Sequence, residues 1–221
     1  MADHFLHGVE VVEIDNGPRP IRTVRSSVIG LVGTAPDADE QRFPLNTPVL
    51  IAGSRLEAAK LGATGTLPMA IDGIFDQAGA LVVVIRVAEG ATESETQTHV
   101  IGGVDEAGQY LGLQALLAAQ SVAKVTPRIL IAPGFTHQRP TDPDDNTRQL
   151  ANPVVAELLG IAERLRAVII ADGPNTTDAA AIDYREDWGS ARIYVVDPHV
   201  KVMKNGAVVT EPVSARVAGL I

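Results

Sequence analysis

The sequence predicts an α/β fold in which a largely parallel sheet carries helices on both faces. Short apolar strand patterns alternate along the chain with amphipathic helix patterns, and this alternation implies right-handed crossovers between parallel strands. The run Leu81-Val82-Val83-Val84-Ile85 has no polar alternation, which suits a central strand covered on both faces. An extended N-terminal arm and a C-terminal β-hairpin followed by a helix complete the predicted architecture.

The arm is residues 8–14, where apolar side chains alternate with Glu10 and Glu13 in a short strand pattern. The turn Asn16-Gly17-Pro18-Arg19-Pro20 separates this segment from the rest of the chain. A strand isolated in this way can lie at the edge of its own sheet or pair with the sheet of another chain. The pattern alone leaves both readings open.

The first core elements follow the arm in order. Residues 21–33 and 48–52 read as strands because each contains a run of apolar side chains. Ser54 and Glu57 have the spacing of a capping box, which predicts a short helix. Thr66 is the expected N-cap of the next, longer helix.

The second half of the chain repeats the alternation. Residues 89–108 read as an acidic, glycine-rich connection, and Asn152-Pro153 has the pattern of a helix N-terminus. Helices are expected at residues 110–119, 152–166 and 177–188, and strands at residues 128–132, 167–171 and 191–196.

The C-terminal segment changes character. Apolar residues flank Asn205-Gly206, the dipeptide that most strongly predicts a two-residue hairpin. Glu211-Pro212 then opens a helix with an apolar stripe, formed by Val213, Val217, Leu220 and Ile221. A stripe at the end of a chain either docks onto its own domain or faces a partner domain that the chain does not reach, and the pattern does not separate the two.

The composition excludes several classes of function. The 221 residues include no Cys, so a disulfide framework, a thiolate metal site and a cysteine nucleophile are excluded. The formal net charge of −9 repels a phosphate backbone and an anionic membrane surface alike. No nucleic-acid partner and no membrane partner are therefore expected, and the chain shows neither a signal-peptide pattern nor an apolar run of membrane-spanning length.

Motifs for catalysis or phosphate binding are missing from the sequence. Gly30 and Gly33 follow a strand pattern, but no third glycine completes the dinucleotide spacing, and no Gly-Lys-Ser or Gly-Lys-Thr triplet occurs. The five histidines are scattered, and Asp142-Pro143-Asp144-Asp145-Asn146 lacks the central glycine of a calcium loop. The best small-molecule candidate is Asp172-Gly173-Pro174-Asn175, which follows a buried strand at its carboxyl end. An ordinary turn is the competing reading of that segment.

Several short segments stand in a distinctive order along nearly the whole chain. They are His7-Gly8-Val9, Ser27-Val28-Ile29-Gly30-Leu31-Val32-Gly33-Thr34-Ala35, Phe43-Pro44-Leu45-Asn46-Thr47-Pro48, Pro127-Arg128-Ile129-Leu130-Ile131-Ala132-Pro133-Gly134, Ala171-Asp172-Gly173-Pro174-Asn175, Val196-Asp197-Pro198-His199-Val200 and Ser214-Ala215-Arg216-Val217-Ala218-Gly219-Leu220. Read together, they resemble the tail sheath subunits of contractile bacteriophages and R-type pyocins, although no single segment is specific.

The resemblance implies a structural protein rather than an enzyme, with no cofactor and no metal. Subunits of that family stack as hexameric rings around an inner tube and contract to drive the tube through a bacterial envelope. The implied partners are neighbouring sheath subunits joined by strand exchange, the tail tube protein contacted through a C-terminal domain that this chain does not reach, and the baseplate. The implied location is the virion tail or pyocin particle, assembled in the cytoplasm of the bacterial host.

The resemblance also implies roles for particular residues. Residues 1–20 would be the N-terminal arm, residues 21–199 the outer α/β domain, and residues 200–221 the start of a truncated tube-proximal domain. The arm would contact a neighbouring subunit through His7, Val9, Val11, Val12 and Ile14. The stripe that would dock against the missing domain is Val213, Val217, Leu220 and Ile221.

Two alternatives stay open. One is a small-molecule-binding α/β domain or enzyme, with its ligand at the turn Asp172-Gly173-Pro174-Asn175. The other is a sheath subunit of a related secretion or toxin-delivery machine, because the same fold serves both kinds of assembly.

Overall fold

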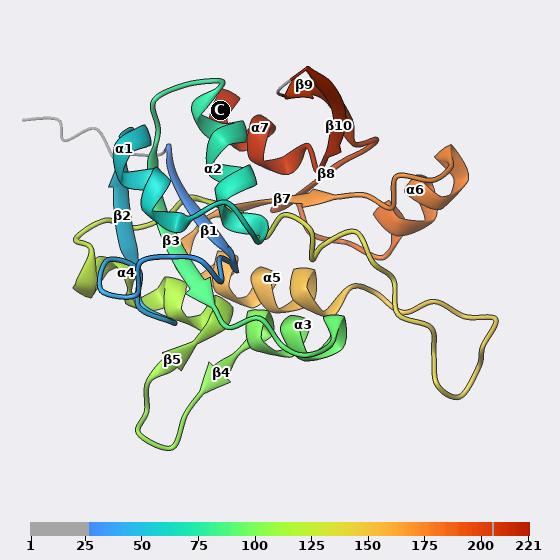
Figure 1. The fold of residues 1–221 in the computed structure, drawn as a ribbon. Coiled ribbons are helices and arrows are strands. Elements are labelled where there is room, and N and C mark those ends of the chain that lie inside the picture. The colour runs from blue at the N-terminus through green and yellow to red at the C-terminus, as the bar shows by residue number, and fades with distance from the viewer. Residues whose placement is uncertain (1–26, 205) are drawn as a thin grey trace, which may run out of the picture.

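The computed structural model describes residues 27–204 and 206–221, which form a six-stranded sheet with helices on both faces (Figure 1). The strand order is β2-β3-β1-β6-β7-β8. The neighbours from β3 to β8 pair in parallel, while β2 pairs antiparallel with β3. This arrangement confirms the predicted α/β fold with its largely parallel sheet.

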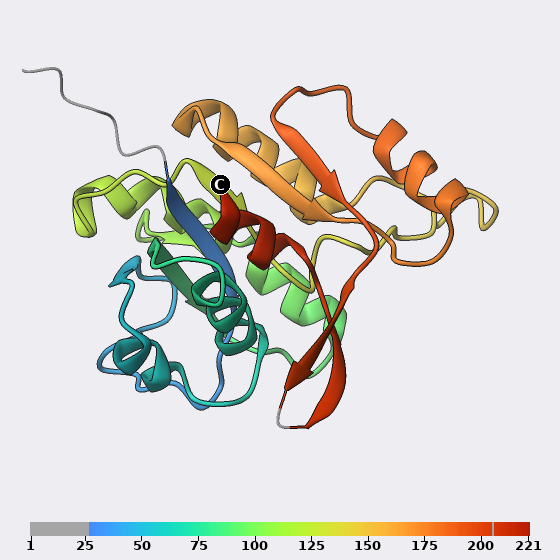
Figure 2. The ribbon, with the colours of Figure 1, turned by 90° about the horizontal axis from the view of Figure 1, so that it is seen from above.

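The strands of the main sheet are β1 (Val28–Thr34), β2 (Val49–Ala52), β3 (Leu81–Val87), β6 (Ile129–Ile131), β7 (Val168–Asp172) and β8 (Ile193–Val196). Two small antiparallel sheets consist of β4 (Gly103–Val104) with β5 (Tyr110–Leu111), and of β9 (Val200–Lys204) with β10 (Ala207–Glu211). The second of these is the predicted C-terminal hairpin, which projects from the body of the molecule (Figure 2).

The α-helices are α1 (Arg55–Ala58), α2 (Thr66–Phe75), α3 (Glu93–Ile101), α4 (Ala119–Val122), α5 (Pro153–Leu165), α6 (Asp178–Glu186) and α7 (Ser214–Leu220). Short 3-10 helices span Ala59–Leu61 and Gly112–Ala118. None of the helices within the described part of the chain is long and apolar enough to cross a membrane.

The sheet separates two hydrophobic clusters because successive side chains of a strand point to opposite faces. In β1, Val28 and Val32 join the cluster under α5 and the Gly112–Ala118 helix, while Ile29 and Leu31 join the cluster under α2 and α7. Figure 1 shows α2 and α7 on one face of the sheet and α3 and α5 on the other. Burial on both faces explains why the strand patterns are continuously apolar rather than alternating.

Helix α5 is the element that its sequence signals describe best. Asn152 is its N-cap, and the Asn152 side chain accepts a hydrogen bond from the backbone N–H of Val155 at 3.0 Å. The same side chain donates to the carbonyl oxygens of Phe135 at 3.0 Å and Gln138 at 2.8 Å. A cap that is itself fully buried therefore ties the loop after β6 to the helix.

Three local predictions are corrected. Residues 89–108, expected as a connection, contain helix α3, whose mostly polar surface buries only Thr96 and Val100 and so gives no apolar period. Residues 110–119, expected as one helix, divide into β5 and a 3-10 helix, because Gly112 adopts a positive φ of 55° there. Thr66 is the first residue of α2 rather than its N-cap, which is Gly65.

The single tryptophan lies beside α6. Trp188 is 7% exposed, and its ring packs edge-to-face on Tyr184 with 6.2 Å between ring centroids. The hydroxyl of Tyr184 donates a hydrogen bond to the carbonyl oxygen of Thr136, in the loop after β6. This aromatic pair fixes α6 to the core, since Tyr184 is the one residue of that helix that is buried.

Replacing the α5 cap should destabilise the fold more than replacing an exposed cap. We expect Asn152→Ala to lower the free energy of unfolding by about 2–3 kcal/mol, because a helix cap and two hydrogen bonds to buried carbonyl oxygens are lost. The matched control is Thr177→Ala at the exposed cap of α6, with an expected loss of about 1 kcal/mol or less. Urea unfolding followed by circular dichroism measures both, and equal losses would contradict the assigned role of Asn152.

Candidate functional site: the carboxyl edge of the sheet and the exposed strand edges

Asp172 lies at the carboxyl end of β7, where an open α/β sheet usually binds ligands. Its side chain is fully buried and accepts hydrogen bonds from Ser214, from the backbone N–H at 2.8 Å and from the hydroxyl at 2.6 Å. The backbone N–H of Asp172 donates to the Thr136 hydroxyl at 3.0 Å. The start of helix α7 thus occupies the position at which the sequence suggests a small-molecule site.

The ionisation of Asp172 is set by opposing effects. Burial raises the pKa of the carboxyl group above its ordinary value, while the two hydrogen bonds from Ser214 and the charge of His199 lower it by less. A buried carboxylate is costly unless hydrogen-bonded. Both of its oxygens are engaged by Ser214, so the group serves the connection between β7 and α7.

The rest of the predicted ligand turn is held by the segment after β8. The backbone N–H of Asn175 donates to the Asp197 carboxylate at 2.7 Å, and the Asn175 side chain accepts from the backbone N–H of His199 at 3.0 Å. A Cβ atom on Gly173 would lie 2.7 Å from an Asp197 carboxylate oxygen, so a larger residue does not fit there without movement. These contacts fix the turn to the segment after β8, and a small-molecule function at this turn is not favoured.

Two histidines lie beside this turn. The rings of His137 and His199 pack edge-to-face with 5.7 Å between centroids. Burial, and then the neighbouring His199, lower the pKa of His137. Within the described residues, no cluster of three or more His, Asp or Glu side chains could hold a metal ion.

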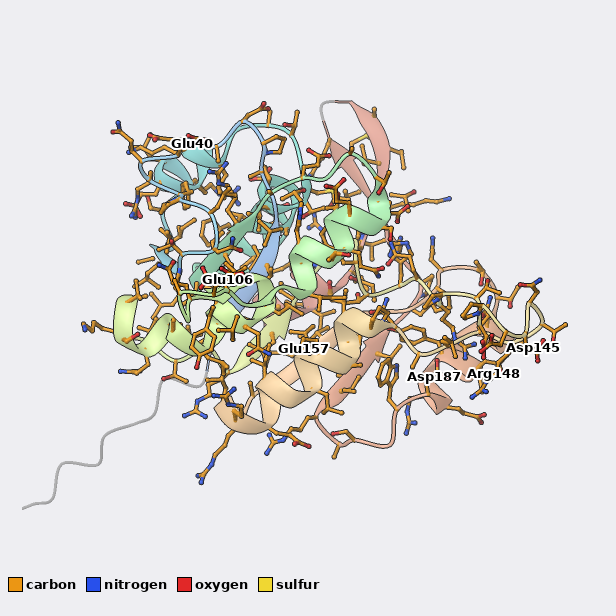
Figure 3. All side chains as sticks on the ribbon, turned by 90° about the horizontal axis from the view of Figure 1, so that it is seen from below. Glu40, Glu106, Asp145, Arg148, Glu157 and Asp187 are labelled. Carbon is orange, nitrogen blue, oxygen red and sulfur yellow. The ribbon has the colours of Figure 1, made fainter. Side chains whose placement is uncertain are left out.

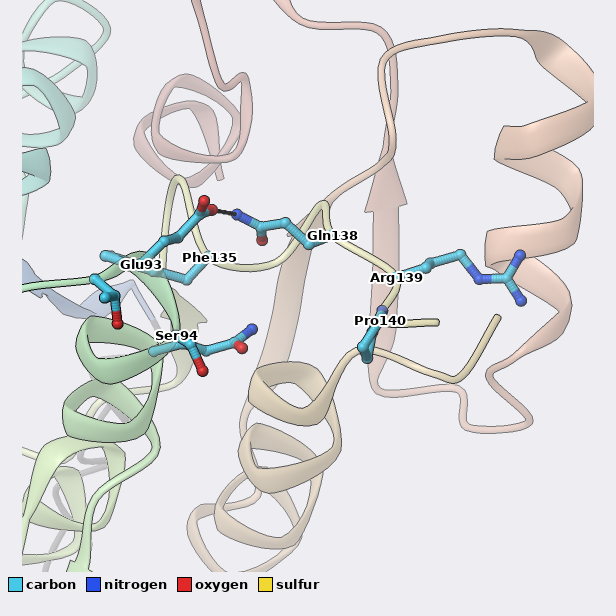
Figure 4. Close-up of a pocket in the computed structure, with 8 residues that line it drawn as sticks. Glu93, Ser94, Phe135, Gln138, Arg139 and Pro140 are labelled. Atoms are coloured by element: carbon cyan, nitrogen blue, oxygen red, sulfur yellow. Dashed lines mark hydrogen bonds between the residues drawn. The ribbon is translucent and has the colours of Figure 1, made fainter. Parts of the chain in front are cut away.

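A pocket of about 460 Å³ lies between the start of α3 and the loop after β6 (Figure 4). Its acidic residue, Glu93, accepts a hydrogen bond from the Gln138 side chain at 2.9 Å. Its basic residue, Arg139, pairs with Asp187 at 2.8 Å. Glu93 is thus hydrogen-bonded and Arg139 is ion-paired, and the residues that line the pocket include no histidine that could act as a base for Ser94. The pocket therefore lacks the arrangement of a hydrolytic site.

The predicted apolar stripe of helix α7 has a packed half and an exposed half. Ala215 and Gly219 lie against α2, and Ala218 is buried as well. Val213 and Val217 pack half-buried against the same core. The stripe's last two residues, Leu220 and Ile221, are 71% and 67% exposed. The first half of the stripe thus contacts the chain's own domain, while docking of the second half against another domain stays a prediction.

The hairpin β9–β10 is attached to α7 by an ion-pair network. Glu211, which is 2% exposed, pairs with Lys204 at 2.6 Å and with Arg216 at 3.2 Å. Arg216 also reaches Asp76 at the end of α2, at 3.1 Å. The hairpin is therefore fixed at its base, while its outer part exposes apolar side chains such as Met203 and Val208.

The remaining predicted interface residues lie elsewhere. The arm residues His7, Val9, Val11, Val12 and Ile14 are outside the described residues. The segment that carries Asp142, Asp144 and Asp145, which we call the acidic loop, lies within the described residues, and Figure 3 shows Asp145 near Arg148 at one end of the molecule. Within this loop the Arg148 side chain lies 3.7 Å from the Asp142 carboxylate.

The partners of Asp172 were not foreseen from the sequence. Thr136 is 36 residues before it and Ser214 is 42 residues after it, so neither forms a local motif with the carboxylate. The one available signal was Ser214 at the beginning of a predicted helix, a position at which N–H groups lack partners within the helix. That signal indicates a helix start but does not identify the acceptor.

Comparison with known proteins gives concordant matches. Residues 26–87 match the family model described as the N-terminal region of domain III of tail sheath protein Gp18. A putative prophage major tail sheath protein of Pseudomonas aeruginosa is 39% identical over 219 residues, covering 98% of this chain and 53% of that protein. The tail sheath protein of Escherichia phage P2 is 38% identical over 206 residues, covering 90% of this chain and 48% of that protein.

Two solved structures share the fold. The contracted helical sheath of the anti-feeding prophage has a TM-score of 0.50 at 20% identity, over 97% of this chain and 52% of that chain. The contracted sheath complex of PVC, an extracellular contractile injection system, has a TM-score of 0.54 at 13% identity, over 99% of this chain and 50% of that chain. The chain thus has the fold of these contracted sheath structures.

More particularly, the chain is similar over nearly its whole length to tail sheath proteins of phages and prophages, as the sequence resemblance predicted. It spans about half the length of the curated relatives that it matches.

Removing the Asp172 carboxylate should weaken the attachment of α7. We expect Asp172→Ala to lower the free energy of unfolding by about 3 kcal/mol, because the N–H and hydroxyl of Ser214 lose a charged acceptor. Ser214→Ala removes one of the two hydrogen bonds and should cost about 1–2 kcal/mol. Urea unfolding measures both values, and a Ser214→Ala loss as large as that of Asp172→Ala would contradict this account.

The raised pKa of Asp172 predicts a pH dependence with a definite sign. The folded protein binds a proton at this carboxyl more tightly than the unfolded chain, whose value is near 3.8. The stabilisation linked to this group is therefore fully present below pH 3.8 and is lost as the pH rises through the raised value. The free energy of unfolding of the wild type, minus that of Asp172→Asn, should fall as the pH rises above 3.8. Unfolding measured at several pH values tests this sign, and a difference that grows with pH would refute it.

Proposed function

We propose that this chain is part of a structural subunit of a contractile tail sheath. Such subunits stack as hexameric rings around an inner tube, and their contraction drives the tube through a bacterial envelope. The observation that carries the proposal is the 39% identity with a prophage tail sheath protein over 98% of the chain. The carboxyl edge of the sheet supports a structural role, because its buried carboxylate binds the chain's own α7.

Neighbouring sheath subunits are the first partners in this proposal. The arm, with His7, Val9, Val11, Val12 and Ile14, would add a strand to the sheet of a neighbour, because its strand pattern is cut off from the core by a proline-rich turn. Main-chain ladders of this kind hold subunits together while allowing them to rotate. Phage sheath relatives support a place in the virion or particle tail, with assembly in the host cytoplasm.

The tail tube protein and the baseplate would be contacted through parts of the protein outside this chain. In this proposal residues 21–199 form the outer domain, and residues 200–221 lead into a tube-proximal domain. The contacts of Glu211 and Arg216 support the assignment of this segment as the joint between the two domains. Exposed Leu220 and Ile221 would then meet the tube-proximal domain, with Val213 and Val217 continuing the stripe on the near side.

A sheath of a secretion or toxin-delivery machine is the second candidate. The structural similarity to two contracted injection-system sheaths favours it. The sequence identities of 37–39% are with phage and prophage proteins, so a phage-type tail is the first choice.

The assembly test uses the product of the complete reading frame that contains this chain. We expect hollow tubes by negative-stain electron microscopy, and we expect them to be lost when residues 1–17 are deleted, because the strand that joins neighbours is then missing. Monodisperse particles from both proteins at every salt concentration would contradict the sheath proposal. Tubes from both proteins would contradict only the role of the arm and would leave the sheath proposal unaffected.

The acidic loop provides a second test in the same protein. Asp144 and Asp145 are exposed at the edge of the outer domain, where contacts between outer domains would form on contraction. Reversing the charges of Asp142, Asp144 and Asp145 to Lys should change the stability of the contracted sheath to heat or urea, measured by light scattering. The control reverses Glu106, exposed on the β4–β5 hairpin. A contracted sheath with unchanged stability would exclude the loop from these contacts.

A further inference from the structure

The two outer edges of the six-stranded sheet differ. At β2, the Arg42 side chain donates a hydrogen bond to the Leu50 carbonyl oxygen at 3.4 Å and pairs with Glu57 of α1 at 3.1 Å. At β8, the residues Ile193-Tyr194-Val195-Val196 include no charged residue, proline or glycine. Edge strands of soluble proteins are normally protected by such residues or by a covering element. β2 has this protection, and β8 does not within the described part of the molecule.

The backbone of β8 presents hydrogen-bonding groups outward. The carbonyl oxygen of Arg192 accepts from the N–H of Ile169 in β7 at 2.7 Å, and that of Val196 accepts from the N–H of Gly173, directly after β7, at 2.8 Å. Residues of a parallel strand alternate between facing their partner and facing away. Val195 therefore turns its N–H and C=O away from β7, and no hydrogen bond from residues 27–204 or 206–221 reaches either group.

A groove of about 620 Å³ runs beside this edge, between β8 and α6. Its apolar surface includes Ile182 and Tyr194, which are 58% and 60% exposed. Its rim is charged, with Arg185 and Glu186 on α6 and Asp197 after β8. An open strand edge beside a helix is the geometry in which proteins accept an additional strand, with main-chain hydrogen bonds and side-chain pockets acting together.

The hairpin β9–β10 has complementary properties. Each of its strands has one partner, so its outer edges are open within the described residues. Two-stranded hairpins are marginally stable alone and are stabilised by further strands. Met203 and Val208 on the hairpin are 69% and 62% exposed, and β9 carries Lys201, opposite in charge to Glu186 and Asp197 beside β8.

We propose that the β8 edge of one copy pairs with strand β9 of a second copy. Val195 then exchanges main-chain hydrogen bonds with β9, and Tyr194 and Ile182 cover apolar side chains of the hairpin. Lys201 lies near Glu186 and Asp197 on the rim of the groove. The two surfaces are different, so the contact is head-to-tail and propagates into a ring or a helical assembly rather than closing a two-fold dimer. This pairing rests on the proposed sheath function for its biological role, but it has its own test.

The test exploits the lack of cysteine in this chain. In the complete gene product, with any cysteine outside this chain replaced by serine, Tyr194→Cys and Met203→Cys variants are purified separately, mixed, and treated with a short thiol–thiol cross-linker. A covalent dimer is expected from the mixture and not from either variant alone. Leu56→Cys, at a site 82% exposed on α1, replaces Met203→Cys as the control. Dimers from Tyr194→Cys alone, or none from the mixture, would overturn the proposal.

A second variant tests the main-chain contact. Val195→Pro removes the outward N–H of β8 while leaving the N–H groups that face β7. In the Tyr194→Cys background it should abolish the cross-link to Met203→Cys, whereas Val195→Ala should retain it. Retention of the cross-link by a folded Val195→Pro protein would refute strand pairing. Tubes in the electron microscope without this cross-link would support the sheath function and contradict the pairing of β8 with β9. The cross-link without tubes would support the pairing and contradict the sheath function.

Discussion

The buried carboxylate of Asp172 is the constraint on which the arrangement of the C-terminal third depends. A carboxylate removed from water is tolerated only when donors replace its hydration, and here the donors are the backbone and hydroxyl of Ser214. Satisfying that requirement brings α7 against the sheet beside α2. The position of α7 in turn fixes Glu211 and Arg216, and through them the base of the β9–β10 hairpin. One charge at a strand end therefore orients an element that begins about thirty residues later.

Open α/β sheets have a recurrent crevice at the carboxyl ends of their strands, and many proteins bind nucleotides or substrates in it. In this chain the crevice is filled by contacts between segments of the chain itself. The turn after β7 is locked to the segment after β8 through Asn175 and Asp197, and the strand end is covered by α7. The fold class by itself is common among enzymes, but here Ser214 of the same chain engages both oxygens of Asp172, where a ligand would otherwise bind. The proposed function depends instead on exposed strand edges and on the segments that join neighbouring subunits, which agrees with the similarity to tail sheath proteins.

The parts of the fold that the sequence predicts well are those specified by neighbouring residues. Asn152-Pro153 marks the start of α5 because cap and helix are adjacent, and the apolar run in β3 indicates burial on both faces without knowledge of the partners. Helix α3 was missed because its exposed surface leaves only Thr96 and Val100 buried, too few to give a period. The contact of Asp172 with Ser214 could not be predicted, since it spans 42 residues and depends on the packing of α7. For the same reason the sequence suggests a ligand at the end of β7 but does not predict that the start of α7 occupies this position.

The aromatic pair on α6 has a spectroscopic consequence. Since Trp188 is the only indole in the chain, near-ultraviolet emission excited at the red edge arises from a single place. That place is the end of the helix that borders the β8 groove, in edge-to-face contact with Tyr184 and next to Asp187, the partner of Arg139. The wavelength and quenching of this emission are governed by local polarity and by nearby carboxylates. The molecule therefore carries an intrinsic fluorophore at the border of its open sheet edge, and events there can be followed in solution without attaching a dye.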